Sequence, residues 1–370
     1  MTQESVEERE IRAESAIFPE ELEKLAVDKN EAVRRLVAQN NNTPASLLEK
    51  LATDKEGNVR QEVAGNENTP VAALEKLAAD EEVWVRQEVA KNENTPPFTL
   101  EKLAVDNDID VRLGVAGNAN VPVATLEKLV TDKDKDVREA VAYNKNTPPS
   151  ALEKLAVDKS EGVRLSLVVN ANIPASTLGI LVVDKNARVR RLAARNGNIS
   201  LSLLENLANN KDKHTREGVG CNENTPVSAL EKLAVDKEED VRRETAGNNN
   251  TPASLLEKLA SDKNKDVRQA VAKNVNTPTS LVDKLAMDKN KDVRRGVADN
   301  RNTPVSLLEK LATDKEDWVR WGVAINENTP ISLLEKLATD ENEGVRRAVK
   351  VSLKQKHDGI DTKETGNGQK

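Results

Sequence analysis

The feature that most constrains this chain is a repeat of 26 residues that continues through most of its length. The five letters NENTP occur at residues 66–70, 92–96, 222–226 and 326–330, and the intervals between these copies are all multiples of 26. Written in this frame, thirteen units occupy residues 18–351, and no insertion breaks the register. A strict period of this length is typical of an elongated array whose units bury surface only against their neighbours.

Each unit begins with a short helix, as the stretch "PASLLEKLA" at residues 44–52 illustrates. The spacing of Leu48 and Leu51 predicts one buried face, with the charged residues between them in solvent. We expect Thr43 to be the N-cap and Pro44 to occupy the first helical position, where its missing N–H has no cost. A helix this short is also expected to have some 3-10 character.

A second amphipathic helix follows in "NVRQEVAGN" at residues 58–66, where Val59 and Val63 lie four residues apart on one face. Its closing Asn66 is expected in the left-handed conformation that often ends a helix, a conformation that asparagine tolerates better than most residues. NENTP is therefore interpreted as the joint between one repeat and the next.

A pairing of arginine with aspartate also recurs. An arginine follows a valine in the second helix of all thirteen units, and an aspartate lies six residues earlier in twelve of them, the departure being Asn210. This D-x-x-x-x-V-R pattern resembles the signature of HEAT repeats, in which the two residues bond across neighbouring units as a ladder. The ladder leaves few arginines for a ligand, and the net charge of -7 does not favour general phosphate binding.

The whole unit, N-x-N-T-P-x-x-L-L-E-K-L-A-x-D-K-x-x-x-V-R-x-x-V-A, resembles the bacterial leucine-rich repeat variant family. The resemblance implies an all-α fold, a right-handed α-solenoid (superhelix) of about thirteen two-helix repeats without strands. A member of that family carries an iron-sulfur cluster on cysteines before its repeats. Here the only cysteine is Cys221, so we expect no such cluster and no other cofactor.

Four positions of the second helix vary from repeat to repeat. In one unit they are Asn58, Gln61, Glu62 and Gly65, whose spacing places them on one side of the helix. We call the surface formed by these four positions in all repeats the variable face. By analogy with HEAT arrays it lines the concave side. All three tryptophans and the only tyrosine fall on it, and exposed aromatic residues are frequent anchors of interfaces.

Two clusters on the variable face are predicted binding sites. The tryptophan cluster, Trp318, Trp321 and Ile325, lies beside Gly322 and is interpreted as a pocket for a partner's hydrophobic side chain. The arginine column, Arg188, Arg191 and Arg195, suits acidic groups. With their neighbours, the candidate partner-binding residues are Trp84, Tyr143, Leu165, Val169, Arg188, Arg191, Arg195, Trp318, Trp321 and Ile325.

The predicted function is a non-enzymatic scaffold that binds a protein or an extended peptide. The variable face carries nine basic and eleven acidic residues, and mixed signs favour such a partner over nucleic acid. Catalysis has little support, because His214 and Cys221 are separated by about 10.5 Å of helix. Two rivals stay open: a nucleic-acid binder that uses the arginine column and the aromatic residues, and an architectural or self-assembling array. Packing of the aromatic residues between repeats is the alternative to a binding role.

The ends and the middle of the array are less regular. Residues 1–17 are expected to form a charged helix that caps the first unit, and residues 352–370 a polar, disordered tail. Residues 196–216 are expected to form a weaker contact between repeats, because Asn210 replaces the ladder aspartate. The sequence shows no apolar signal segment or membrane span, and its lone cysteine suggests a cytoplasmic protein.

Overall fold

The chain is an α-solenoid, seen here in a computed structural model that describes residues 4–365, and the side chains of residues 4–356. Residues 4–365 contain helices, turns and bends but no strand. The chain divides into two compact units, which we call unit 1 (Met1–Leu181) and unit 2 (Val182–Lys370). The predicted all-α repeat architecture is confirmed.

Unit 1 opens with α1 (Val6–Ser15), a helix that precedes the first repeat. The short first helices of its repeats are α2 (Pro19–Leu25), α4 (Ala45–Leu51), α6 (Val71–Leu77), α8 (Pro97–Leu103), α10 (Val123–Leu129), α12 (Pro149–Leu155) and α14 (Ala175–Leu181). The longer second helices are α3 (Glu31–Gln39), α5 (Gly57–Gly65), α7 (Val83–Lys91), α9 (Ile109–Gly117), α11 (Lys135–Tyr143) and α13 (Glu161–Val168).

Unit 2 continues the same alternation. Its short helices are α16 (Leu201–Leu207), α18 (Val227–Leu233), α20 (Ala253–Leu259), α22 (Thr279–Leu285), α24 (Val305–Leu311) and α26 (Ile331–Leu337). Its longer helices are α15 (Ala187–Arg195), α17 (Lys213–Cys221), α19 (Glu239–Gly247), α21 (Lys265–Lys273), α23 (Lys291–Asp299), α25 (Asp317–Ile325) and α27 (Glu343–Thr365).

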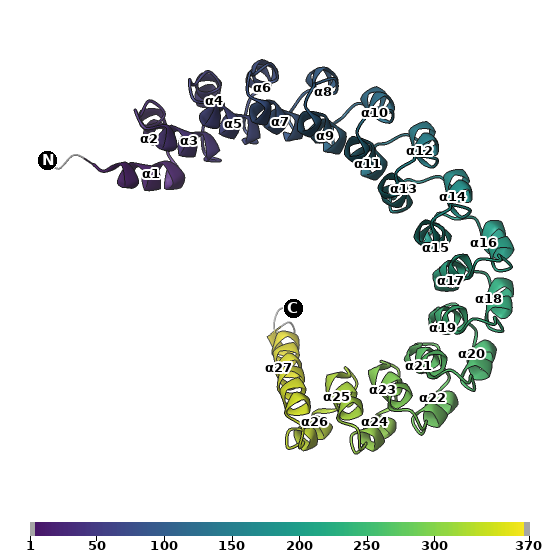
Figure 1. Cartoon of the computed structure of the whole chain (residues 1–370). Coiled ribbons are helices and arrows are strands. Elements are labelled where there is room, and N and C mark those ends of the chain that lie inside the picture. Colours follow the sequence, from purple (N-terminus) through teal and green to yellow (C-terminus); the bar gives the residue numbers. More distant parts are fainter. Residues whose placement is uncertain (1–3, 366–370) are drawn as a thin grey trace. The chain divides into compact units, whose positions relative to one another are not determined.

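Within each unit the helices form two layers (Figure 1). The even-numbered helices make one layer and the odd-numbered helices the other, and the odd-numbered layer lies on the inner side of the bend of each unit. Successive odd-numbered helices pack closely against one another, whereas successive even-numbered helices touch much less. The odd-numbered layer therefore carries most of the contact between repeats.

The core consists of aliphatic side chains that recur at the same positions in each repeat. In the second repeat, Leu48, Val59 and Val63 are completely buried and Leu51 nearly so, as the helical spacing predicts. Small alanine and valine side chains fill the space between the odd-numbered helices. Burying each leucine or valine side chain contributes about 1.5 to 3 kcal/mol, and in an array of this kind the burial depends on neighbouring repeats.

The start of the short helices that follow Thr-Pro differs from the prediction, as α4 illustrates. Pro44 is the N-cap of α4, with an extended backbone, and the helix begins at Ala45. Thr43 is not the cap: its Oγ1 donates a hydrogen bond of 2.5 Å to the Val37 carbonyl at the end of the preceding helix. The threonine therefore adds a second donor to a carbonyl in the last turn of α3, which also accepts from the Asn40 N–H at 3.2 Å. The short helices among residues 4–365 are assigned as α-helical, and their ends have the i→i+3 bonds of a 3-10 turn, such as that from the Leu47 N–H to the Pro44 carbonyl at 2.9 Å.

The asparagine at each joint also differs from the prediction. Asn66 has an extended backbone, at φ -73° and ψ 129°, and no residue of the described chain, glycine included, has positive φ. Its Nδ2 donates to the Ala38 and Asn40 carbonyls of the preceding repeat, at 2.8 and 3.1 Å. Its Oδ1 accepts from the Asn68 N–H at 2.9 Å. NENTP is the joint between repeats, as predicted. The joint is held by a buried asparagine side chain that bridges two repeats, and not by a left-handed residue.

The arginine ladder is present as predicted. Arg34 donates from Nε and Nη2 to the two carboxylate oxygens of Asp54 in the next repeat, at 2.6 and 2.9 Å. Its Nη1 donates to the Asp28 carbonyl of its own repeat at 2.8 Å. Both side chains of the Arg34–Asp54 pair are more than nine-tenths buried. Each such arginine therefore holds its own turn and the following repeat at once.

The repeat that lacks a ladder aspartate still forms an arginine–aspartate pair with its neighbour. Asn210 replaces the aspartate, yet Asp212 two residues later pairs with Arg190 at 2.9 and 3.0 Å. This pair is more exposed than the regular ones, at 19% for Arg190 and 26% for Asp212. The expected loss of a contact near residues 196–216 is thus compensated, because a carboxylate reaches the same guanidinium from a nearby position.

Both ends of the repeat pattern extend further than expected. At the N-terminus α1 packs on α3, and its Arg9 pairs with Asp28 at 2.6 Å, so α1 takes the place of a second helix. At the C-terminus, residues 352–365 of the expected disordered tail lie in α27. Ser352 is buried at the joint-asparagine position and donates to the Ala324 carbonyl at 2.8 Å. Residues 366–370 lie outside the described residues.

We predict that Asp80→Asn destabilises the array by about 3 kcal/mol, because it leaves the buried Arg60 guanidinium without its charged partner. The matched control is Glu81→Gln. Glu81 lies 3.8 Å from the same Arg60 but is 86% exposed, so its loss should cost less than about 1 kcal/mol. Urea unfolding followed by circular dichroism compares the two variants, and equal stability would contradict a structural role for the ladder.

The ladder also predicts a loss of stability in acid. Burial acts to raise the pKa of Asp54, but the hydrogen bond and charge of Arg34 and the Glu56 N–H outweigh it, so the pKa lies below its ordinary value. A carboxyl whose pKa is lowered by folding stabilises the fold above its unfolded pKa, and this contribution is lost as pH falls. The free energy of unfolding should therefore decline below about pH 4. Between pH 6 and pH 3 the free energy of unfolding of Asp80→Asn should fall by less than that of the wild type. An equal fall would contradict this assignment.

Candidate partner-binding surface

The variable face lies on the odd-numbered helices, on the inner side of the bend in each unit (Figure 1). Its four positions are not equally accessible. In α5, Asn58 and Gly65 at the two ends of the face are exposed, whereas Gln61 and Glu62 between them are partly buried. The last position of the face, at the C-terminal end of each helix, is therefore open to a partner in most repeats.

The tryptophan cluster is a compact aromatic group on α25. The rings of Trp318 and Trp321 meet edge to face, with their centroids 5.9 Å apart. Trp318 is 53% and Ile325 41% exposed, whereas Trp321 is partly buried against the core of unit 2. Trp321 therefore has the intramolecular role considered as an alternative, and Trp318 and Ile325 remain accessible.

The space expected beside Gly322 is filled. A Cβ at Gly322 would lie 3.0 Å from the Ala298 Cβ and 3.0 Å from Asp299 Oδ1, so the glycine allows α23 to approach α25 closely. The same tight contact recurs at Gly114, whose Cβ would lie 2.9 Å from Ala90, and at Gly218, where it would collide with the Arg191 carbonyl. Glycine at this position serves helix packing and leaves no pocket.

A hollow of about 290 Å³ is lined by Trp321 together with Ile325, Arg295, Asp299 and Arg301. The Arg295 guanidinium lies over both indole rings, 5.0 Å from the Trp318 centroid and 5.2 Å from the Trp321 centroid. Such contacts orient a cation and keep it over the aromatic surface. The site therefore combines an apolar floor with an oriented arginine, whose charge is shared with Asp299 at 3.7 Å.

Arg295 was not among the predicted residues, although the sequence contains the signal that identifies it. It lies 26 residues before Trp321, so it occupies the same position of the variable face in the preceding repeat. Residues one period apart are neighbours in an array of this kind. A comparison along the period would have placed Arg295 beside the tryptophans.

The arginine column is less open than predicted. Arg188 and Arg195 are exposed, but Arg191 is paired with Glu217 at 3.5 Å and with Glu244 at 3.1 Å. The Glu217 side chain is only 4% exposed and also contacts His214 Nδ1 at 3.3 Å. Arg191 thus belongs to an internal charge network across three repeats of unit 2, and it is not a free anchor for an acidic partner.

Cys221 belongs to the same network. Its Sγ donates to Glu244 Oε2 at 2.9 Å, and burial, reinforced by this carboxylate, raises the pKa of the thiol to about 12. A thiol in this state is a poor nucleophile. His214 contacts Glu217 instead, so the two residues weighed as a catalytic pair have separate partners.

Of the predicted residues in unit 1, two lie together and the others lie apart from them. Tyr143 is 69% and Val169 56% exposed, and together they line a hollow of about 360 Å³. Leu165 is partly buried on α13. Trp84 is 43% exposed and its indole lies above Gly57, where a Cβ would be 3.6 Å from Nε1. Tyr143 and Val169 are thus brought together.

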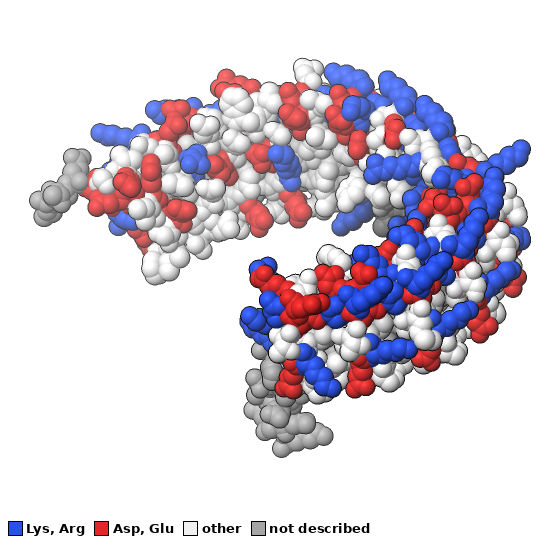
Figure 2. All heavy atoms as spheres, turned by 60° about the horizontal axis from the view of Figure 1, so that its bottom comes forward, with Lys and Arg blue, Asp and Glu red and all other residues white. Residues whose placement is uncertain are grey.

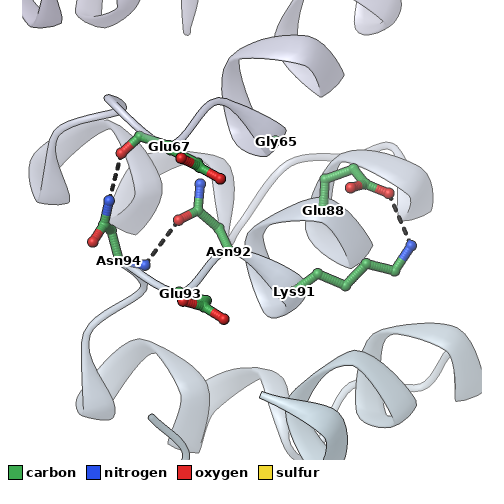
Figure 3. Close-up of a pocket in the computed structure, with 7 residues that line it drawn as sticks. All are labelled: Gly65, Glu67, Glu88, Lys91, Asn92, Glu93 and Asn94. Carbon is green, nitrogen blue, oxygen red and sulfur yellow. Dashed lines mark hydrogen bonds and ion pairs between the residues drawn. The ribbon is translucent and has the colours of Figure 1, made fainter. Parts of the chain in front are cut away.

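A third hollow, of about 350 Å³, lies nearer the N-terminus of unit 1 and was not predicted (Figure 3). Four of its lining residues are Gly65, Glu67, Glu93 and Lys91. Lys91 pairs with Glu88 at 3.0 Å, so that carboxylate is already compensated. Glu67 and Glu93 are exposed and form no ion pair within the described part of the chain. The hollow is therefore acidic.

The described side chains contain no group of three His, Cys, Asp or Glu residues arranged to hold a metal ion. Among residues 4–365, every helix is too short or too polar to cross a lipid bilayer.

Two-helix repeats joined by an arginine–aspartate ladder and by bridging asparagines define this chain as a helical-repeat protein of the α-solenoid class. Residues 57–82 and 136–160 match the family model described as "Leucine rich repeat variant". These two segments are therefore similar to leucine-rich repeat variant repeats, and the predicted resemblance is confirmed for them.

Several solved structures are similar to this chain at low identity. A leucine-rich repeat variant described as having a novel repetitive structural motif is 21% identical, over 74% of this chain and 88% of that one, with a TM-score of 0.31. An engineered protein is 20% identical, over 90% and 98% of the two chains, with a TM-score of 0.26. A structure that concerns Kap95p binding to RanGDP is 12% identical, over 96% of this chain and 55% of that one, with a TM-score of 0.40. No curated protein matches the sequence.

The environment of Cys221 predicts a slow reaction with thiol reagents in the folded protein. At pH 8 the raised pKa should make its reaction with Ellman's reagent roughly 100-fold or more slower than in the unfolded chain. Glu244→Gln should accelerate the native reaction, because it removes the carboxylate that opposes the thiolate. A native rate equal to that of the unfolded chain would contradict the buried, hydrogen-bonded thiol.

Proposed function

We propose that this protein is a non-enzymatic scaffold that binds a protein or an extended peptide through the variable face of its odd-numbered helices. The observation that carries the proposal is the exposure of Trp318 and Ile325 above a partly buried Trp321, with Arg295 fixed over the two indoles. An apolar surface held in place and rimmed by charge is typical of the centre of an interface.

The charges of the surface support this partner class over nucleic acid. The ladder arginines are buried with their aspartates, and Arg191 is held by two glutamates. Nucleic-acid binding depends on basic side chains that are free to contact phosphates. In the arginine column only Arg188 and Arg195 are exposed, and Figure 2 shows both signs of charge on the surface of each unit.

The test is affinity capture from a lysate of the source organism, with and without nuclease. The bait is the full chain, and the test variant is Trp318→Ala/Trp321→Ala. We expect the wild type to retain a partner protein that resists nuclease, and the double variant to lose at least nine-tenths of it.

The matched control is Phe98→Ala, which removes a 61% exposed aromatic ring from α8 in the other layer of the fold. It should retain the partner at the wild-type level. Capture abolished by nuclease would favour the nucleic-acid alternative. Equal recovery by wild type and double variant would contradict binding at the tryptophan cluster.

A further inference from the structure

Three hollows follow one another along the inner layer of unit 1, and each shares a lining residue with the next. The acidic hollow between α5 and α7 shares Lys91 with a hollow of about 270 Å³ between α7 and α9, which Leu113 and Asp110 line. That second hollow shares Gly117 with the hollow of Tyr143 and Val169. A Cβ at Gly117 would meet no atom within 4 Å, so the surface is open at the residue that these two hollows share. We call the three hollows together the unit 1 groove.

One end of the unit 1 groove is apolar. Tyr143 and Val169 are among the most exposed large hydrophobic side chains of the unit, and Ala119 and Ala171 of the joints line the same hollow. Leu113 of α9, which is partly buried, lines the middle hollow. Exposed apolar surface of this kind, gathered in a depression, marks a site of interaction.

The other end of the groove is acidic. Glu67 and Glu93 line the first hollow and Asp110 the second, and all three side chains are exposed without an ion pair in the described residues. Lys91 lies among them but is compensated by Glu88 at 3.0 Å. The remaining cation of the lining, Lys145, lies at the apolar end. The acidic end therefore has three carboxylates without a positive partner.

The length of the groove limits what can occupy it. From the first hollow to the third, it crosses about three helix spacings of 8 to 10 Å, which is roughly 24 to 30 Å. An extended chain covers this distance with about seven to nine residues. A small molecule would fill only one hollow, whereas a short peptide segment spans all three.

We infer that the unit 1 groove binds an extended protein segment that carries lysine or arginine residues at one end and an apolar side chain seven to nine residues away. The basic residues lie beside Glu67, Glu93 and Asp110, and the apolar side chain lies between Tyr143 and Val169. Complementary charge selects the segment and fixes its direction in the groove, since the reverse orientation places its cations beside Lys145. This inference rests on the proposed function and names one class of partner for it.

The experiment uses fluorescein-labelled peptides of twelve residues and fluorescence anisotropy with the full chain. The basic–apolar peptide has three lysines, a neutral spacer and a leucine pair at the far end. One comparison peptide has glutamate in place of each lysine, and another has serine in place of each leucine. We expect the basic–apolar peptide to bind at least tenfold more tightly than either comparison peptide, and to weaken as salt is raised from about 50 to 200 mM.

Substitutions in the unit 1 groove test whether the peptide binds there. Glu67→Gln/Glu93→Gln/Asp110→Asn should weaken the basic–apolar peptide about tenfold, and the triple change of the same residues to lysine should reverse the preference toward the glutamate peptide. Tyr143→Ser should remove the advantage of leucine over serine. These residues are exposed, so the variants should keep the wild-type circular dichroism spectrum.

The control Trp318→Ala/Trp321→Ala should bind the basic–apolar peptide as the wild type does. Binding that ignores peptide charge, or that survives the lysine triple variant with the same preference, overturns the inference. Absence of binding by all three peptides also overturns it, while capture at the tryptophan cluster would still support the proposed function. Peptide binding that depends on Trp318 and Trp321 would support the proposed function and overturn the unit 1 site.

Discussion

The bond between each ladder arginine and the aspartate of the next repeat is the interaction on which the rest of this structure depends. Single repeats have too little apolar surface to fold alone, so the array exists only if neighbours adhere in one register. The Arg34 guanidinium fixes that register, because its planar fork donates to two carboxylate oxygens and a backbone carbonyl in a single geometry. At the other end of the odd-numbered helix, the joint asparagine fixes the position of the neighbouring repeat in the same way. Between the two, small aliphatic side chains are sufficient for the core.

The fold was predictable because one pattern occurs thirteen times. Buried positions such as Leu48, Val59 and Val63 followed from helical spacing, and the ladder followed from the D-x-x-x-x-V-R pattern. The roles of Thr43 and Asn66 did not follow. The prediction treated each helix end as an isolated chain would satisfy it, by a capping side chain or a left-handed residue. In the array the groups left open at a helix end are satisfied across the joint, so neither device is needed.

The candidate surface was predictable only in part, because a sequence pattern identifies positions but not what fills the space between them. The variable face was placed correctly on the second helices, and Trp318, Ile325, Tyr143 and Val169 are exposed there. The predictions that space lies beside Gly322 and that Arg191 is available to a partner were wrong, because both depend on the neighbouring repeats. Glu244, which holds Arg191, lies two repeats further along the chain. The groove of unit 1 was missed because small residues such as Gly117 give no signal of their own.

The close contacts at Gly114, Gly218 and Gly322 have a consequence for recognition. Where glycine occupies this position, two odd-numbered helices meet through backbone and alanine, and where a larger residue such as Glu62 occupies it, a side chain stands between them. The chemical surface between one recognition position and the next therefore changes along each unit, although the sequence period is constant. A ligand with its own regular repeat would meet a different surface at successive contacts. The array therefore suits ligands whose side chains differ from one contact to the next.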